Sequence, residues 1–171
     1  ILDQLVGDVQ VRCVGRDTHR GADAETVDGG ALVEHVADLE LVQSAAGEDV
    51  QVVQSEIEAF LEMKAAQGEK SDFIFMDLDK PMYARCYKLI MEKELLAPGG
   101  IMLCDNVLYR GLTAQHNAGE LPAVSEKTAA NAAAMDAFLG QVREDTAAGK
   151  VRSLMMPVRD GMLALQMPQA A

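Results

Sequence analysis

The sequence predicts an α/β fold with a mostly parallel, doubly wound sheet and a C-terminal antiparallel hairpin. Short, wholly apolar runs alternate along the chain with stretches whose apolar residues recur at helical spacing. Two more apolar runs near the C-terminus flank a segment of turn-forming residues. The chain has 171 residues, 49% of them hydrophobic and 25% charged, which is the size and balance of one folded domain. We therefore expect a single domain over residues 1–171.

The first part of the chain predicts two helices and two strands. Residues 1–30 contain a Val-rich run, 9–14, followed by polar, turn-like residues, which indicates a strand and then a loop. A helix is expected over 31–46, a short strand over 50–53 and a second helix over 57–68. The apolar faces of the two helices consist of Leu32, Val36, Leu39 and Val42, and of Ile57, Phe60 and Leu61.

The central part predicts two buried strands joined by a helix. Residues 73–76 form a continuous apolar run between acidic residues, as expected for a strand buried on both faces. A third helix is expected over about 83–95, and the Pro-Gly-Gly run that follows should end it. Residues 101–104 predict another wholly apolar strand.

The last part predicts a loop, a helix and a hairpin. Residues 111–127 are polar, and we expect a loop there. A fourth helix is indicated by apolar residues at helical spacing: Met135, Phe138, Leu139 and Val142. Strands are expected over 151–156 and 162–167, with the turn at Arg159-Asp160-Gly161.

Composition and charge exclude several classes of protein. No apolar run approaches the roughly 18 residues that a membrane-spanning helix needs. With 15 basic and 27 acidic residues, the formal net charge is −12, so we expect neither nucleic acid nor a membrane surface as a partner. The cysteines, Cys13, Cys86 and Cys104, have no metal-like spacing and predict free thiols in a reducing compartment. The N-terminal residues show no targeting pattern, and we expect a cytoplasmic location.

Two clusters of polar side chains directly follow the two central apolar strands. The first is Asp77-Leu78-Asp79-Lys80, and the second is Asp105-Asn106. Ligands of open α/β sheets bind beyond the carboxyl ends of the strands, so the two clusters are expected to meet at one site. The alternative is that each cluster is only a solvated loop or a helix cap.

The chemistry of these side chains indicates a metal site with a basic group beside it. Asp77, Asp105 and Asn106 offer only oxygen ligands, which suit a hard divalent cation such as Mg²⁺ or Ca²⁺. Such a cation could hold two adjacent substrate oxygens and ease the deprotonation of a hydroxyl. Lys80 is the candidate general base, because burial lowers the pKa of a lysine. Its alternative role is that of a solvated lysine at the start of a helix.

The sequence contains three motifs, at residues 72–83, 96–100 and 105–111. Together they resemble those of the cation-dependent O-methyltransferases, which include the caffeoyl-CoA type and the related catechol enzymes. Residues 156–162 are similar to that family's C-terminal hairpin. The resemblance covers about Asp49 to Met167. It implies a Rossmann-like class I S-adenosylmethionine-dependent methyltransferase fold, with a chain that is N-terminally incomplete or divergent over 1–30.

The resemblance also implies roles for residues of the two clusters. Asp77, Asp105 and Asn106 match the family's metal-binding positions, and Lys80 matches the proposed base of the catechol enzymes. Substrate contacts are expected from Asp77, Tyr109 and Arg110, although the family usually has Trp where Tyr109 stands. The segment after Arg110 corresponds to the family's variable, substrate-choosing loop.

Cofactor-binding positions match the family less well. Asp79 corresponds to a residue that contacts S-adenosylmethionine in the caffeoyl-CoA type. Asp28 stands near the position of the ribose-binding acid, but it could equally be a turn former. Ile57 lies in the segment that meets adenine, and Cys86 replaces a cofactor-contacting tyrosine. The family's glycine-rich loop, G-x-x-x-G-x-S, is not recognisable in the sequence.

The expected function is divalent-metal-dependent transfer of a methyl group from S-adenosylmethionine to a hydroxyl of a catechol-like or caffeoyl-type acceptor. The partner is then a small hydroxylated aromatic substrate, and the resemblance implies a homodimer. The main alternative is a catalytically inactive methyltransferase-like domain that serves as a binding or scaffold module. A different metal-dependent α/β enzyme, such as a phosphoryl-transfer protein, lacks support because the sequence contains no P-loop pattern.

Overall fold

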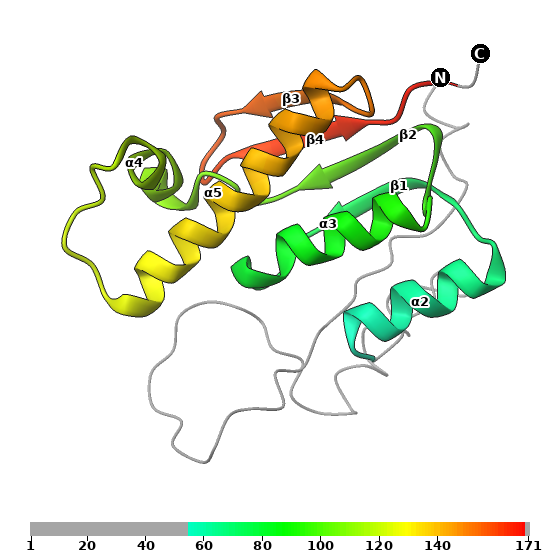
Figure 1. The fold of residues 1–171 in the computed structure, drawn as a ribbon, viewed down its shortest axis with the longest axis horizontal. Coiled ribbons are helices and arrows are strands. Elements are labelled where there is room, and N and C mark those ends of the chain that lie inside the picture. Colours follow the sequence, from blue (N-terminus) through cyan, green and yellow to red (C-terminus); the bar gives the residue numbers. More distant parts are fainter. Residues whose placement is uncertain (1–54, 170–171) are drawn as a thin grey trace.

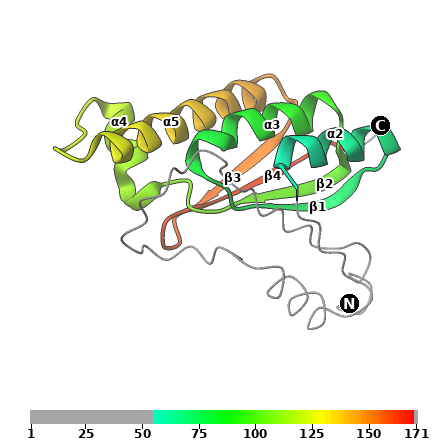
Figure 2. The ribbon, with the colours of Figure 1, turned by 90° about the horizontal axis from the view of Figure 1, so that it is seen from below.

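The computed structural model describes residues 55–169, which form a four-stranded mixed sheet with helices packed on one face (Figure 1 and Figure 2). The elements, in chain order, are α2 (Ile57–Gln67), β1 (Ser71–Met76), η1 (Lys80–Met82), α3 (Tyr83–Glu92), β2 (Leu96–Cys104), η2 (Tyr109–Gly111), α4 (Leu112–Ala118), α5 (Glu126–Ala147), β3 (Arg152–Met156) and β4 (Met162–Gln166). The elements η1 and η2 are single turns of 3-10 helix. The two strands and the helix expected over 1–54 lie outside the described residues.

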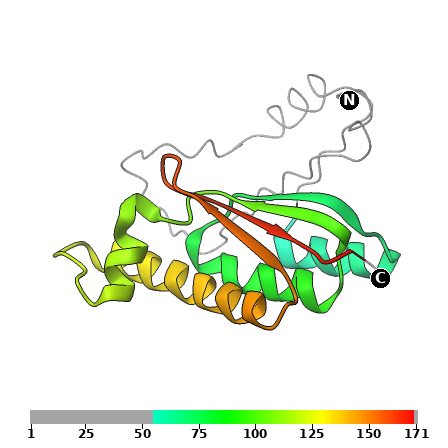
Figure 3. The ribbon, with the colours of Figure 1, turned by 90° about the horizontal axis from the view of Figure 1, so that it is seen from above.

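The sheet has the strand order β1-β2-β4-β3. β1 and β2 run parallel and are joined by α3, whereas β4 runs antiparallel to both β2 and β3. The hairpin of β3 and β4, orange and red in Figure 3, therefore extends the sheet beyond β2. The predicted α/β sheet and its C-terminal antiparallel hairpin are confirmed.

Local sequence signals set the ends of the helices. α2 ends at Gly68, whose left-handed φ of 68° is accessible to glycine without strain, and its N–H donates to the carbonyl of Ala65. α5 begins after Ser125, whose hydroxyl oxygen accepts a hydrogen bond from the N–H of Thr128 at 3.2 Å. The helix predicted over 57–68 is confirmed, and the fourth helix extends past its predicted apolar positions at both ends.

The prediction of a loop over 111–127 is wrong, because this segment contains α4 and the first two residues of α5. Glycines with φ of 80° and 72°, Gly111 and Gly119, bound α4. Its Thr113 is buried, and the hydroxyl donates to the carbonyl of Val107 at 3.1 Å. Tertiary contacts therefore stabilise a helix too short and too polar to show in the sequence pattern.

The prediction that strand 73–76 is buried on both faces is also wrong. Phe73 and Phe75 of β1 are 38% and 42% exposed, and Ile101 of β2 is 40% exposed. The alternate residues Met76 and Met102 are buried under the helices. The helices of residues 55–169 lie on one face of the sheet (Figure 2). A doubly wound sheet has helices on both faces, and the helical layer on the second face stays a prediction.

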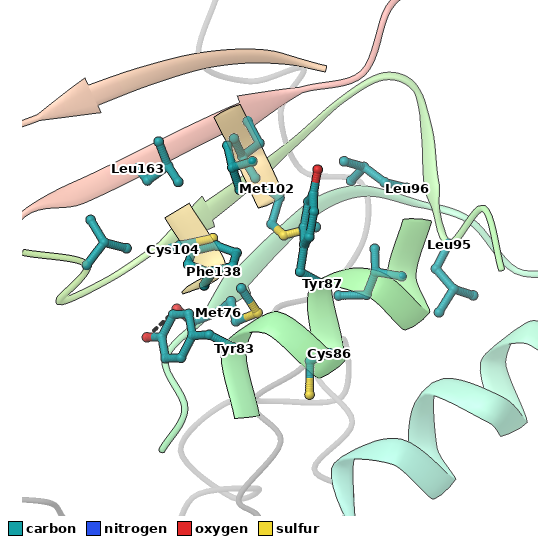
Figure 4. Packing of buried hydrophobic residues seen from close by; sticks show 14 of the residues in the cluster. Met76, Tyr83, Cys86, Tyr87, Leu95, Leu96, Met102, Cys104, Phe138 and Leu163 are labelled. Atoms are coloured by element: carbon teal, nitrogen blue, oxygen red, sulfur yellow. Dashed lines mark hydrogen bonds between the residues drawn. The ribbon is translucent and has the colours of Figure 1, made fainter. Parts of the chain in front are cut away.

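The hydrophobic core lies between the sheet and the helices α3 and α5 (Figure 4). Tyr83 and Tyr87 of α3 are fully buried, and their ring centres lie 5.5 Å and 5.6 Å from the ring centre of Phe138 in α5. Such tilted and edge-to-face pairs each add about 0.5–1.5 kcal/mol beyond the burial of apolar area. The aromatic cluster thus joins α3 to α5 above the strand residues.

In the described part of the chain, no helix is long and apolar enough to cross a membrane.

Candidate active site

The two polar clusters lie next to each other at the carboxyl ends of β1 and β2. Met76 and Cys104 are paired in the parallel ladder, and the N–H of Asp105 donates to the carbonyl of Met76 at 3.0 Å. Asp77 and Asp105 therefore follow directly on paired strand positions. This register brings the clusters together, as predicted from the carboxyl-end rule for α/β sheets.

Lys80 connects the two clusters. Its Nζ lies 3.4 Å from Oδ1 of Asn106 and 3.4 Å from the carbonyl of Leu78, at the long end of hydrogen-bond distances. The ammonium is also 5.0 Å from the ring centre of Tyr83, in a cation–π position. Burial lowers the pKa of Lys80, and the nearby carboxylates, Asp77 and Asp105 foremost, oppose this effect only in part.

The loop after β2 has an unusual backbone. Asn106, Tyr109 and Arg110 have φ values of 56°, 45° and 57°, in the left-handed region that non-glycine residues rarely occupy. The N–H of Asn106 donates to Oδ1 of Asp105 at 2.6 Å, which supports the first of these conformations. Positive φ at non-glycine residues stores strain and is concentrated at functional sites, so this loop is a candidate part of an active site.

The rest of the molecule holds this loop in place. The N–H groups of Val107 and Leu108 donate to the carbonyls of Gly161 and Asp160 in the β3–β4 turn, at 3.0 and 2.8 Å. On the other side, Nδ2 of Asn131 in α5 donates to the hydroxyl of Tyr109 at 3.2 Å. The half-buried Tyr109 is thus oriented by α5, and Arg110 beside it is exposed.

The predicted cofactor residues lie at three different places. Asp79 is exposed and precedes η1, and its carbonyl accepts from the N–H of Met82 at 2.9 Å. Ile57 is half-buried at the start of α2. Cys86 is 1% exposed, its sulfur lies on the side of α3 turned away from Met102 (Figure 4), and burial raises the pKa of its thiol to about 11. Asp28 lies outside the described residues. The cofactor role of all four stays a prediction.

Tyr83 is a residue of this region for which the sequence pattern predicted no role. Its hydroxyl donates to the carbonyl of Asp105 at 2.7 Å, and it also lies 3.3 Å from the carbonyl of Met76. The spacing in the sequence could have placed Tyr83 beside Lys80, because Tyr83 follows Lys80 by three residues and so lies one helical turn further along. Nothing in the pattern showed that its hydroxyl reaches the second cluster.

The donor set fits a hard divalent cation by its chemistry. Asp77, Asp105 and Asn106 offer carboxylate and amide oxygens at one end of the sheet, and waters or substrate oxygens would have to complete the shell. Among residues 55–169, no group of three or more His, Cys, Asp or Glu side chains is arranged to hold a metal. The metal-ligand role of these three residues stays a prediction.

Comparison with known proteins identifies the family. The sequence profile of the O-methyltransferase family matches residues 31–167. The chain belongs to this family. The family that the motifs resemble is therefore confirmed as the family of this chain.

Relatives within the O-methyltransferase family agree with this assignment. The "Probable caffeoyl-CoA O-methyltransferase 1" of Dictyostelium discoideum is 35% identical over 98 residues, which are 56% of this chain and 37% of that relative. The chain thus spans little more than a third of this curated relative.

Solved structures of methyltransferases show the same fold. The SAH-bound methyltransferase PaMTH1 of Podospora anserina has a TM-score of 0.60 and 28% identity, and the match covers 74% of this chain and 52% of that one. An O-methyltransferase of Bacillus cereus, in complex with SAH, has a TM-score of 0.61 and 19% identity over 78% of this chain and 59% of that one. The predicted Rossmann-like methyltransferase fold is confirmed.

Proposed function

We propose that this chain is the catalytic part of a divalent-metal-dependent O-methyltransferase. It transfers a methyl group from S-adenosylmethionine to a hydroxyl of a catechol-like or caffeoyl-type aromatic acceptor. The observation that carries the proposal is the meeting of Asp77, Lys80 and Asp105-Asn106 at the carboxyl ends of two adjacent parallel strands. The similar proteins support it, since one is named a probable caffeoyl-CoA O-methyltransferase and two are methyltransferases with bound SAH.

Three residues would hold the metal in this proposal: Asp77, Asp105 and Asn106. When bound, a divalent cation supplies a positive charge that holds the acceptor oxygens and lowers the pKa of the reacting hydroxyl. The hydrogen bond from the Asn106 N–H to Oδ1 of Asp105 leaves the second carboxylate oxygen of Asp105 available as a ligand. Asn106 presents its amide oxygen toward Lys80, on the side that the two clusters share.

Lys80 acts as the general base. Its half-buried amine, with a lowered pKa, accepts the proton of the acceptor hydroxyl. S-adenosylmethionine, when bound, would supply the methyl group to this oxygen and would leave as the neutral thioether S-adenosylhomocysteine. The acceptor is lined by three residues: Asp77, Tyr109 and Arg110. The hydrogen bond from Asn131 orients the Tyr109 ring before the acceptor binds.

The cofactor is proposed to lie across the strand ends, in contact with Asp79 and with Ile57, Cys86 and Asp28. Of these, Asp79 has the most direct support, because it is an exposed member of the first cluster, beyond the carboxyl end of β1. We also propose a cytoplasmic location, in keeping with the free, buried thiols of Cys86 and Cys104, and a homodimeric assembly by analogy with the family.

A catalytically inactive binding or scaffold domain is the second candidate. The observation that favours it is the missing glycine-rich loop G-x-x-x-G-x-S, which allows close approach of the backbone to the cofactor. A scaffold does not need a set of metal ligands with a base beside them. The inactive domain is therefore the less favoured candidate, because the chain has such a set in Asp77, Lys80, Asp105 and Asn106.

Titration calorimetry separates the two candidates. The chain is titrated with Mg²⁺ alone and with S-adenosylhomocysteine alone. The methyltransferase proposal expects binding of both at millimolar concentrations or below. Absence of binding for both ligands would overturn it and leave the inactive domain as the better account. A chain that binds both is then assayed for methyl transfer to a catechol.

A further inference from the structure

One buried hydroxyl contacts the backbone of both strand ends that carry the candidate site. The phenol oxygen of Tyr83 lies 2.7 Å from the carbonyl oxygen of Asp105, which follows β2, and 3.3 Å from that of Met76, the last residue of β1. The same oxygen accepts from the N–H of Leu78, just after β1, at 3.4 Å. Figure 4 shows the hydrogen bond to Met76 as a dashed line.

The geometry ranks these contacts. A phenol has one proton to donate, and the 2.7 Å contact to Asp105 is the short one, so the proton lies on that side. The oxygen's lone pairs then face the N–H of Leu78. The side chain is 0% exposed, so water does not replace either partner if the hydroxyl is removed.

The ring of Tyr83 also supports Lys80. The Lys80 ammonium lies 5.0 Å from the ring centre, and it contacts the carbonyl of Leu78 and the amide oxygen of Asn106. One side chain therefore touches the backbone on each side of the site and lies beneath its candidate base.

We propose that Tyr83 is a positioning residue, whose hydroxyl sets the separation of the Asp77 and Asp105 segments and thereby the spacing of their oxygen ligands. The proposal rests on the proposed function for the identity of the ligand, a divalent cation. It assigns Tyr83 no contact with the acceptor or the cofactor, and it predicts that loss of the hydroxyl is felt at the metal site.

The chain contains a matched control in Tyr87, one turn later in α3. Tyr87 is also 0% exposed, and its ring also packs on Phe138, at 5.6 Å compared with 5.5 Å for Tyr83. Its hydroxyl, however, donates to Asp145 in α5 at 2.9 Å, away from the two clusters. Tyr83→Phe and Tyr87→Phe each keep a buried ring and remove one buried hydroxyl, and we expect both to fold with a lowered Tm.

The test measures two quantities on the full chain and on both variants. The first is amide hydrogen exchange of residues 77–79 and 105–107, which requires no ligand. The second is the Kd for Mg²⁺, by titration calorimetry. We expect Tyr83→Phe to speed exchange in both segments and to raise the Kd about tenfold, as the loss of an outer-sphere partner typically does, and Tyr87→Phe to leave both quantities close to wild type.

The outcomes distinguish the two proposals. If the exchange rates of Tyr83→Phe equal those of wild type, the positioning role is overturned, because the hydroxyl then has no effect on the two segments. If Tyr87→Phe speeds exchange equally, the role is also overturned, because the effect is then only a general loss of stability. A wild-type Kd in Tyr83→Phe, with Mg²⁺ bound by the unaltered chain, would overturn it as well. If the unaltered chain binds no Mg²⁺, the metal-dependent function fails, and exchange alone decides whether Tyr83 positions the two segments.

Discussion

At the scale of the residue, Lys80 is influenced by two opposing effects. Burial lowers its pKa, and the carboxylates of Asp77 and Asp105 raise it. The balance is a lowered pKa, which brings the amine closer to the range in which a lysine accepts protons near neutral pH. A fully solvated lysine at the start of a helix would show no such burial, and the general-base role of Lys80 stays a prediction.

The first prediction tests this base. Lys80→Met should lower turnover by about 10²–10⁴-fold, because a positioned general base contributes that much, while the Kd for Mg²⁺ stays within a few-fold. Steady-state kinetics and titration calorimetry measure the two effects. Lys88→Met is the control, since Lys88 is an exposed residue of α3 that pairs with Glu92 at 3.7 Å. Near-normal turnover in Lys80→Met would end the general-base proposal but leave the metal proposal standing.

The second prediction concerns the ligand set. Asp105→Ala should weaken Mg²⁺ binding at least about tenfold, because it removes one of three protein ligands and also the acceptor that holds the Asn106 N–H. The control is Asp72→Ala, since Asp72 is an exposed residue of the same sheet near the opposite end of β1. Calorimetry with Mg²⁺ should separate the two variants. Equal affinities would contradict the assignment of Asp105 as a ligand.

At the scale of the element, the β3–β4 turn determines the shape of the loop after β2. Gly161 has a φ of 82°, and a Cβ placed on it would lie 2.3 Å from Cγ of Leu108. Its carbonyl accepts from the N–H of Val107 at 3.0 Å. The two segments are far apart in the sequence, but the turn and the loop contact each other closely enough that only glycine fits.

The third prediction follows from this contact. Gly161→Ala should destabilise the fold by about 1–3 kcal/mol, because it combines a strained φ with a clash against the Leu108 side chain. Gly140→Ala in α5 should instead stabilise it by about 0.5–1 kcal/mol, since the new Cβ lies in a helix and meets only Nη2 of Arg143 at 3.7 Å. Urea unfolding of both variants measures the difference. A Gly161→Ala variant as stable as wild type would show that the turn and the loop are not closely coupled.

At the scale of the whole molecule, a carboxylate at the end of the helical layer joins parts of the chain that lie far apart. Asp145 of α5 is 9% exposed and accepts hydrogen bonds from Lys150 at 2.8 Å and from Tyr87 of α3 at 2.9 Å. The hydrogen bond from Lys150, followed by that from Tyr87, holds the pKa of Asp145 below its ordinary value despite burial. The ionised form is therefore the one that stabilises the fold.

The fourth prediction is the pH dependence of this contribution. Because the pKa of Asp145 is lower in the folded than in the unfolded chain, its stabilisation is complete above the unfolded pKa of about 3.9 and is lost as the pH falls through the folded value. The stability difference between wild type and Asp145→Asn should therefore be largest near pH 6 and shrink below about pH 4. Urea unfolding at pH 6, 4 and 3 measures it. A difference that is constant over this range would contradict the shift.

The same scale shows why several sequence predictions failed. Phe73 and Phe75 were expected to be buried because their run is wholly apolar, but burial depends on what covers each face of the sheet. α4 was missed because its support comes from α5, where Asp136 binds His116 at 3.0 Å and Asn117 at 3.0 Å. Periodicity within a segment carries no information about contacts with another segment.

The sequence by itself determined the helices and strands that depend on local patterns of residues. It also determined that the two polar clusters meet. Apolar runs and helical spacing specified the strands and helices around residues 73–76 and 101–104, and parallel strands bring their carboxyl ends to one edge. Asp77 and Asp105 were therefore predictable neighbours. Only the tertiary structure decided that Asn106 adopts a left-handed backbone, that Asn131 orients Tyr109, and that the Tyr83 hydroxyl joins both strand ends. Each of these depends on distances between segments far apart in the chain, which packing sets and residue type alone does not.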